Sequence, residues 1–143
     1  MDKTNAIGTL LHYLAFSLDR QSDQILQERF GIGLSQQKIL RVVCLHQGVS
    51  QRFVADFLGQ SEASVSRQVG LMLEDGLIYR GVSKADRRQH VLLPTSKDSR
   101  VLEVAEGALN QLHHTVVQCL SAKQQLQLRS MLKSMNQQAR QIG

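Results

Sequence analysis

The sequence predicts a mainly α-helical protein with one small β-hairpin. Apolar residues recur at helical spacing along most of the 143 residues. Residues 77–93 differ, because two short apolar runs flank the polar segment 83–89 there, a pattern typical of a hairpin. Pro94 is the only proline, so long helices can continue without interruption on both sides of the hairpin.

Two helices are predicted in the first third of the chain. The first covers about residues 4–30 and ends at the glycine-containing breaker 31–33. The second begins at Leu34, with Ser35 as its expected N-cap, and ends near Gly48. Both helices carry a wide apolar face, which needs a partner surface to cover it.

Two short helices follow, and they form a helix-turn-helix pattern. The first begins after Ser50 and is ended by Gly59, and the second begins after Ser61 and is ended by Gly76. Two short helices joined by a glycine-containing turn are typical of DNA-binding proteins. The second helix has one apolar face, formed by Val65, Val69, Met72 and Leu73.

Two further helices complete the chain. Thr95 or Ser96 caps the first, which reaches about Leu120, and Ser121 caps the second. A small winged helix-turn-helix does not need two long helical ends for its own core, so we expect these ends to pair in a homodimer. Three regions result: an N-terminal dimerisation helix (1–33), a winged helix-turn-helix DNA-binding domain (34–96) and C-terminal dimerisation helices (97–143).

The charge distribution favours an anionic partner. The formal net charge is +5, and residues 80–100 hold six Lys and Arg against two Asp. Most of the excess therefore lies in and around the hairpin. The chain has no apolar stretch long enough to span a membrane and no signal-peptide pattern at its start, so we expect a cytoplasmic protein without membrane association.

Enzymatic and metal-binding functions find little support in the sequence. His113 and His114 are adjacent, so on a helix they point about 100° apart and form no metal pair. Cys44 and Cys119 do not form a Cys-x-x-Cys motif, and no glycine-rich phosphate loop is present. We expect no enzymatic activity, no metal and no other cofactor.

The second short helix has residue types that suit the major groove of double-stranded DNA. Serine and glutamine can contact base edges, and arginine can reach guanine or phosphate. The N-terminus of the preceding helix can contact phosphate through Ser50 and Gln51. We expect the second short helix to be the recognition helix. Its expected DNA contacts are Ser61, Ser64, Ser66, Arg67 and Gln68. The alternative is an ordinary amphipathic surface helix.

The hairpin tip is predicted to be a basic wing. We expect Arg88 to enter the minor groove, where narrow A/T-rich stretches have an enhanced negative potential. Arg87 and Lys84 are predicted phosphate contacts. Asp86 is interpreted as structural, because an acid repels DNA but can fix the orientation of a neighbouring arginine. The alternative for each cation is a solvated surface charge.

Several motifs resemble the MarR family of bacterial transcription regulators. These are Leu34-Ser35, Val65-Ser66-Arg67, Leu73-Glu74-x-Gly76-Leu77-Ile78-x-Arg80, Asp86-Arg87-Arg88 and Leu93-Pro94-Thr95. The resemblance covers nearly the whole chain and implies a homodimeric winged helix-turn-helix regulator, which we expect to be a repressor that binds a palindromic operator. Pro94, Asp98 and Gly70 depart from the family pattern.

The resemblance also implies that a signal modulates DNA binding. Many family members bind a small aromatic effector between the dimer helices and the winged domain, where His12, Tyr13 and Phe16 are candidates; the simpler interpretation is that they pack the dimer. Cys44 and Cys119 are the candidates for redox sensing, against the simpler interpretation of inert thiols. A winged helix that contacts only proteins, without specific DNA binding, is the alternative function.

Overall fold

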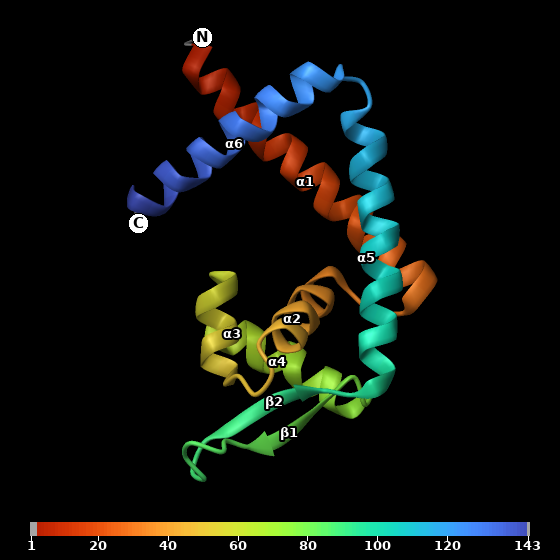
Figure 1. Ribbon diagram of the computed structural model, residues 1–143, viewed down its shortest axis with the longest axis vertical. Coiled ribbons are helices and arrows are strands. Elements are labelled where there is room, and N and C mark those ends of the chain that lie inside the picture. The colour runs from red at the N-terminus through yellow and green to blue at the C-terminus, as the bar shows by residue number, and fades with distance from the viewer. Residues whose placement is uncertain (1–2, 143) are drawn as a thin grey trace. The chain divides into compact units, whose positions relative to one another are not determined.

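The computed structural model describes residues 3–142, with the side chains of residues 6–96 and 99–142. The helices and the hairpin follow in the predicted order, and the predicted fold class is confirmed (Figure 1). The elements of this part of the chain are α1 (Lys3–Phe30), α2 (Leu34–Leu45), α3 (Gln51–Leu58), α4 (Glu62–Glu74), β1 (Ile78–Val82), β2 (His90–Pro94), α5 (Ser96–Val117) and α6 (Ala122–Ile142).

The chain forms two compact units, Met1–Leu109 and Asn110–Gly143. The first contains α1 to α4, the hairpin and the first part of α5, and the second contains the rest of α5 and α6. The division into regions 1–33, 34–96 and 97–143 groups the chain by role and stays a prediction. None of the helices in residues 3–142 is long and apolar enough to cross a membrane.

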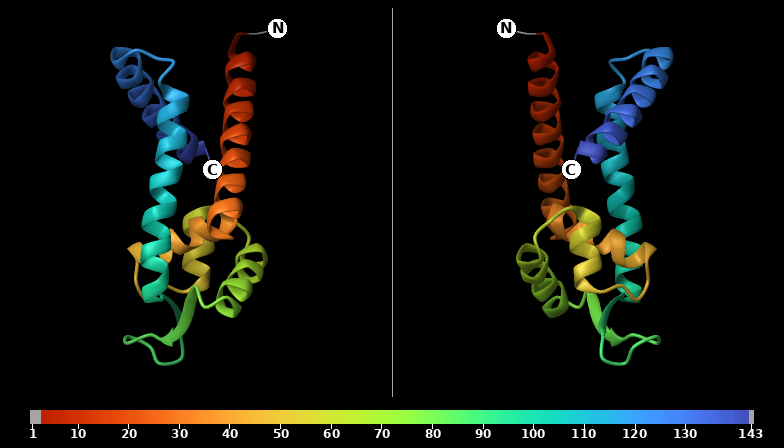
Figure 2. Two further views of the ribbon diagram at one scale, coloured as in Figure 1. Left: turned by 90° about the vertical axis from the view of Figure 1, so that its right-hand side faces the viewer. Right: turned by 90° about the vertical axis from the view of Figure 1, so that its left-hand side faces the viewer.

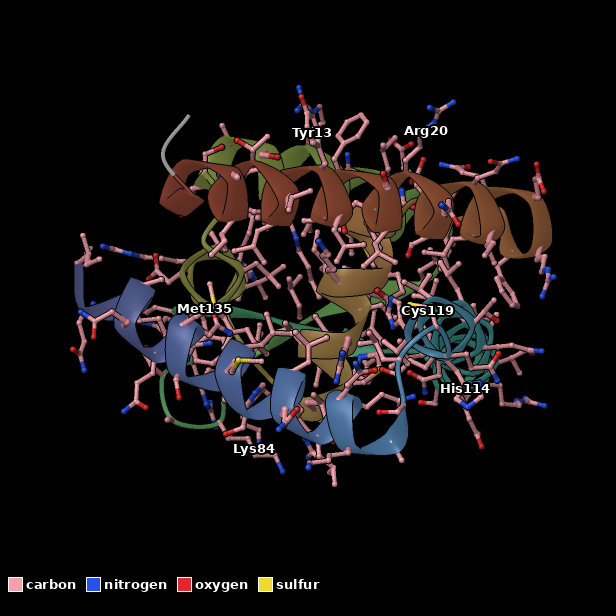
Figure 3. All side chains as sticks on the ribbon, turned by 90° about the horizontal axis from the view of Figure 1, so that it is seen from above. Tyr13, Arg20, Lys84, His114, Cys119 and Met135 are labelled. Atoms are coloured by element: carbon pink, nitrogen blue, oxygen red, sulfur yellow. The ribbon has the colours of Figure 1, made fainter. Side chains whose placement is uncertain are left out.

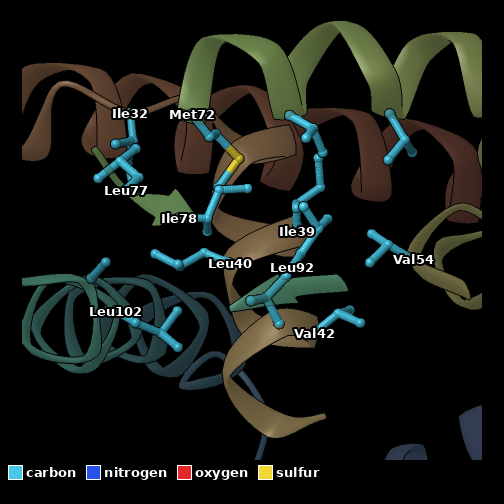
Figure 4. Packing of buried hydrophobic residues seen from close by; sticks show 14 of the residues in the cluster. Ile32, Ile39, Leu40, Val42, Val54, Met72, Leu77, Ile78, Leu92 and Leu102 are labelled. Atoms are coloured by element: carbon cyan, nitrogen blue, oxygen red, sulfur yellow. The ribbon is translucent and has the colours of Figure 1, made fainter. Parts of the chain in front are cut away.

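One hydrophobic core holds the first unit together, and α2 lies at its centre (Figure 4). α2 packs against α1, α3, α4 and β2, so its buried face is covered from several sides. Every element of the unit contributes to the core. The largest fully buried side chains are Leu26, Ile39, Leu40, Val43, Val54, Val65, Val69, Met72 and Ile78.

The short helices begin and end where the sequence indicates. The hydroxyl oxygen of Ser50 accepts a hydrogen bond from the Phe53 N–H at 3.1 Å, and that of Ser61 accepts from the Ser64 N–H at 3.1 Å, so both predicted N-caps are confirmed. Gly59 ends α3 with φ +64°, a left-handed conformation that costs glycine little because it has no Cβ.

The start of α2 corrects one expectation. Gly33, not Ser35, is the N-cap residue. The Leu34 N–H donates to Asp23 Oδ1 on α1 at 2.9 Å, and the Gly33 N–H donates to Gln36 Oε1 at 3.3 Å. A side chain from α1 thus takes the role expected of Ser35, which local sequence could not indicate.

The second unit consists of the end of α5, a turn and α6, and a capping box closes the turn. The Gln124 N–H donates to the Ser121 hydroxyl at 3.2 Å, and the Ser121 N–H donates to Gln124 Oε1 at 2.9 Å. Gln125 Nε2 donates to the carbonyls of Val117 and Leu120 at 3.2 and 3.0 Å. The predicted cap at Ser121 is confirmed, and these bonds fix the turn between α5 and α6.

The central position of α2 leads to a stability prediction. Leu40→Ala should lower the free energy of unfolding by about 2–5 kcal/mol, because Leu40 is fully buried and truncation leaves a cavity. Leu45→Ala, in the same helix, should change it by less than about 0.5 kcal/mol, because Leu45 is 66% exposed. Urea unfolding at one fixed protein concentration measures both, and equal losses would contradict the position of the core.

Candidate nucleic-acid interface

The recognition helix α4 presents Arg67 on the face opposite the core. Val65, Val69 and Met72 are fully buried, and at about 100° per residue Arg67 points almost directly away from them. Arg67 is exposed. Its neighbours on the outer face are Ala63, Gly70, Leu71 and Glu74, and Leu71 is 45% exposed. The outer face therefore combines small residues with one leucine, one cation and one acid.

The other predicted contacts on α4 divide between two sides of the helix. Ser66 is exposed, whereas Ser64 and Gln68 are half-buried. Gln68 lines a polar cleft of about 620 Å³ together with Leu71, Asp75 and residues of α1 and α2. Arg67 and Gln68 therefore do not share one surface, which their adjacency already implies.

The hydroxyls of Ser50 and Ser61 are both engaged in capping. Each serine lies at the first turn of its helix, where the remaining N–H groups point outward. Gln51, the first residue of α3, is half-buried. The two serines cap the N-termini of α3 and α4, and an anion there would meet the positive end of the helix dipole.

The wing is an antiparallel hairpin attached to the core at its base. Ile78 pairs with Pro94, and Val82 pairs with His90 at the far end. Leu92 also bridges to Val49, and the Leu92 N–H donates to the Val49 carbonyl at 2.7 Å. The hairpin extends from the end of the first unit opposite the start of α1 (Figure 2).

Short polar side chains organise the wing tip. The Ser83 hydroxyl accepts hydrogen bonds from the N–H groups of Ala85 and Asp86 at 3.2 and 3.4 Å. Asp86 Oδ1 accepts from the Arg88 N–H at 3.0 Å. The expected link between Asp86 and a neighbouring arginine is thus made to the backbone of Arg88, and the loop satisfies its own polar groups.

The three wing cations point their charge toward solvent. Lys84, Arg87 and Arg88 are exposed. Within the part of the chain that the structure describes, the one ion pair joins Arg41 to Glu106, at 3.4 Å. None of the acids whose side chains the structure describes forms an ion pair with the wing cations, and an anionic partner could compensate their charge.

Two site residues escaped the sequence analysis. Ser83 was assigned only to the polar tip, and its role in fixing the turn was missed. A serine whose hydroxyl accepts from the N–H groups two and three residues further on is a recognisable turn pattern. Thr95 was considered only as a helix cap, yet its hydroxyl donates to the carbonyls of Gly76 and Leu77 at 3.2 and 3.4 Å. No local pattern reveals that contact, because 19 residues separate Thr95 from Gly76.

The cysteines and the candidate metal ligands add no second centre. Cys44 is half-buried against the core. Cys119 is exposed, and its thiol donates to the Val116 carbonyl at 3.4 Å. The two cysteines belong to different compact units. Among the described residues, no three His, Cys, Asp or Glu side chains are grouped so that they could hold a metal ion.

Comparison with known families identifies the central segment. Residues 30–89 match the model of the MarR family, and they contain α2, α3, α4, β1 and the wing loop, but end before β2. In this segment the chain is similar to the winged helix-turn-helix of the MarR family. The resemblance noted in the sequence is thereby confirmed. None of the curated proteins compared with the chain matches it in sequence.

Solved structures extend the MarR likeness beyond this segment. MepR from S. aureus, in a complex with DNA, is 25% identical, with 92% of this chain and 96% of that chain covered and a TM-score of 0.80. A MarR/EmrR family transcriptional regulator from Acinetobacter sp. ADP1 is 23% identical over 99% of each chain, with a TM-score of 0.82. CouR from Rhodococcus jostii RHA1, bound to p-coumaroyl-CoA, is 23% identical over 92% of each chain, with a TM-score of 0.79.

The geometry of the wing tip leads to a second prediction. Asp86→Ala removes the acceptor of the Arg88 N–H, so the order parameter of that amide should fall from about 0.85 to below about 0.6. Asp86→Asn keeps a side-chain oxygen at the same place and should retain the order. Nitrogen-15 relaxation measures both variants, and an unchanged order parameter in Asp86→Ala would contradict the role of Asp86.

Proposed function

We propose that this protein is a homodimeric, sequence-specific DNA-binding transcription regulator, acting as a repressor at a palindromic operator. The observation that carries the proposal is the wing tip, where Lys84, Arg87 and Arg88 are exposed on a loop fixed by Ser83 and Asp86. An ordered loop with uncompensated cations suits a phosphate backbone or a narrow minor groove.

The recognition helix supplies the second half of the interface. Arg67 lies on the outer face of α4, and Ser61, Ser64 and Ser66 lie along its first turns. A helix that buries one face and presents mainly small and polar residues at its N-terminal end can enter the major groove, which is about 12 Å wide. MepR, which was determined in a complex with DNA, has the same fold, and this supports DNA as the partner.

The homodimer is supported by apolar surface that each unit leaves uncovered. On α1, the residues Ile7, Leu10 and Phe16 are exposed, and Tyr13 projects outward from the helix (Figure 3). The second unit carries an apolar groove of about 720 Å³ that includes Val117, Leu126 and Leu132. Exposed apolar faces of this extent are typical of interfaces. A two-fold dimer would present two recognition helices to a palindrome.

Modulation by a small aromatic molecule forms part of the proposal. CouR has the same fold and was determined with p-coumaroyl-CoA bound. His12, Tyr13 and Phe16 are exposed on α1 and are available either to an effector or to the second protomer. Cys119 is the better redox candidate of the two cysteines, since an exposed thiol is accessible to oxidants.

The function can be tested by selection from a pool of random duplex DNA at two salt concentrations. The wild-type protein should enrich a palindrome with half-sites about one helical turn apart and should bind it more weakly at the higher salt concentration. Arg88→Ala should weaken binding about tenfold. It should also reduce the slope of log affinity against log salt concentration by about one.

Arg20→Ala is the matched control, because Arg20 is exposed on α1 and the variant loses the same charge. It should bind the selected DNA like the wild type. Equal losses in the two variants would show that only net charge matters. Absence of any enriched sequence would overturn the proposal in favour of a winged helix that contacts protein.

Gly70, on the outer face of α4, gives a further prediction. A Cβ at Gly70 would meet no atom within 4 Å, so Gly70→Ala should raise the free energy of unfolding by about 0.5–1 kcal/mol. The same methyl should weaken binding to the selected DNA roughly tenfold, or about 1.4 kcal/mol, because it lies beside Arg67 on the face that approaches the bases.

Gly107→Ala in α5 is the matched control, since a Cβ there also meets no atom within 4 Å. It should stabilise the protein similarly and leave the DNA affinity unchanged. Urea unfolding and a binding titration measure both effects. A Gly70→Ala variant with wild-type affinity would place a different face of α4 toward DNA.

A further inference from the structure

Thr95 joins two helices that the chain itself connects only through the hairpin. It follows the last residue of β2 and directly precedes Ser96, the first residue of α5. Its hydroxyl lies 3.2 Å from the carbonyl oxygen of Gly76 and 3.4 Å from that of Leu77. Both carbonyls belong to the junction between α4 and β1, so the start of α5 is bonded to the end of the recognition helix.

The junction itself has little other freedom. The Leu77 N–H donates to the Met72 carbonyl at 2.9 Å, and the Gly76 N–H donates to the Leu73 carbonyl at 3.2 Å, the pair of bonds that closes a helix through a left-handed glycine. Gly76 has φ +69°. The N–H groups of these two residues thus bond to α4, and their carbonyls bond to Thr95.

We propose that Thr95 is a positioning residue for DNA recognition, which holds the C-terminal end of α4 against the first turn of α5. This inference rests on the proposed function. α5 continues past Leu109 into the second compact unit. A displacement of α5 is therefore transmitted to α4 through the Thr95 hydroxyl, and any signal that moves α5 changes how α4 meets DNA.

A second polar contact between α5 and the helix-turn-helix region carries less of this coupling. Arg41 on α2 pairs with Glu106 on α5 at 3.4 Å, but their side chains are 62% and 38% exposed. Water and salt screen such a pair. Thr95 is half-buried, and its bonds end on the backbone of the recognition-helix junction rather than on a mobile side chain.

A merely structural Thr95 would act only on its own helix. If the hydroxyl served as the N-cap of α5 and nothing more, its loss would loosen the first turn of α5 and leave α4 unchanged. If it positions α4, its loss must be detected at Gly76 and Leu77. Amide hydrogen exchange separates the two cases, because it reports the opening of each N–H individually.

The test compares Thr95→Val, which replaces the hydroxyl by a methyl group, with Thr95→Ser, which keeps the hydroxyl. Thr115→Val is the matched control, since the Thr115 hydroxyl donates to the Gln111 carbonyl at 2.9 Å within α5. Thr95→Ala repeats the loss of the hydroxyl without a branched side chain, and thermal unfolding verifies that each variant is folded at the temperature of measurement.

In Thr95→Val and Thr95→Ala, amide exchange at Gly76 and Leu77 should become about fivefold faster. Affinity for the selected palindrome should fall about tenfold, while affinity for a random duplex, which depends on phosphate contacts, should stay unchanged. Thr95→Ser and Thr115→Val should match the wild type in both measurements.

The outcomes separate this inference from the proposed function. A wild-type protein that selects no DNA overturns the proposed function and the role of Thr95 in it. A wild-type protein that selects a site, together with a Thr95→Val variant that binds this site equally well, overturns only the role of Thr95. Faster exchange confined to the first turn of α5 also overturns it.

Discussion

The direction of the recognition helix depends on one junction, the turn from α4 into β1. Gly76 reverses the chain in a left-handed conformation, and the Leu77 N–H bonds back to Met72. The side chains of both Met72 and Leu77 are buried in the same core, so the turn is held by hydrogen bonds and by apolar contact together. A change at this point would alter the helix and the wing at once, because one precedes the turn and the other follows it.

In the wing, one set of side chains fixes the loop conformation and another set supplies the positive charge. Ser83 and Asp86 are short and hydrogen-bond to the backbone of the loop, whereas Lys84, Arg87 and Arg88 are long and extend into solvent. An acid in a basic loop is unfavourable for a polyanionic partner on charge alone. Its bond to the Arg88 N–H explains why the acid is useful there: it orders the cations that follow.

The two compact units differ in how they are held together. The first has a core to which every element contributes. In the second, none of the described residues of α6 is buried, and its turn is fixed by the polar contacts of Ser121, Gln124 and Gln125. A helix pair with so little burial gains stability from a partner surface, which agrees with the exposed apolar residues of α1 and with the dimer that we propose.

Much of this architecture was determined by the sequence alone. Helical spacing, the serines at positions 50, 61 and 121, and the glycines at positions 59 and 76 act over a few residues, so they predicted the order of the elements and their ends. The charge of residues 84–88 likewise indicated a basic wing. Tertiary structure decided the contacts between residues far apart in the chain: Asp23 capping α2, Val49 pairing with Leu92, and Thr95 bonding to Gly76. These contacts depend on how the packed elements meet, and no local pattern of residues indicates which distant residues will be in contact.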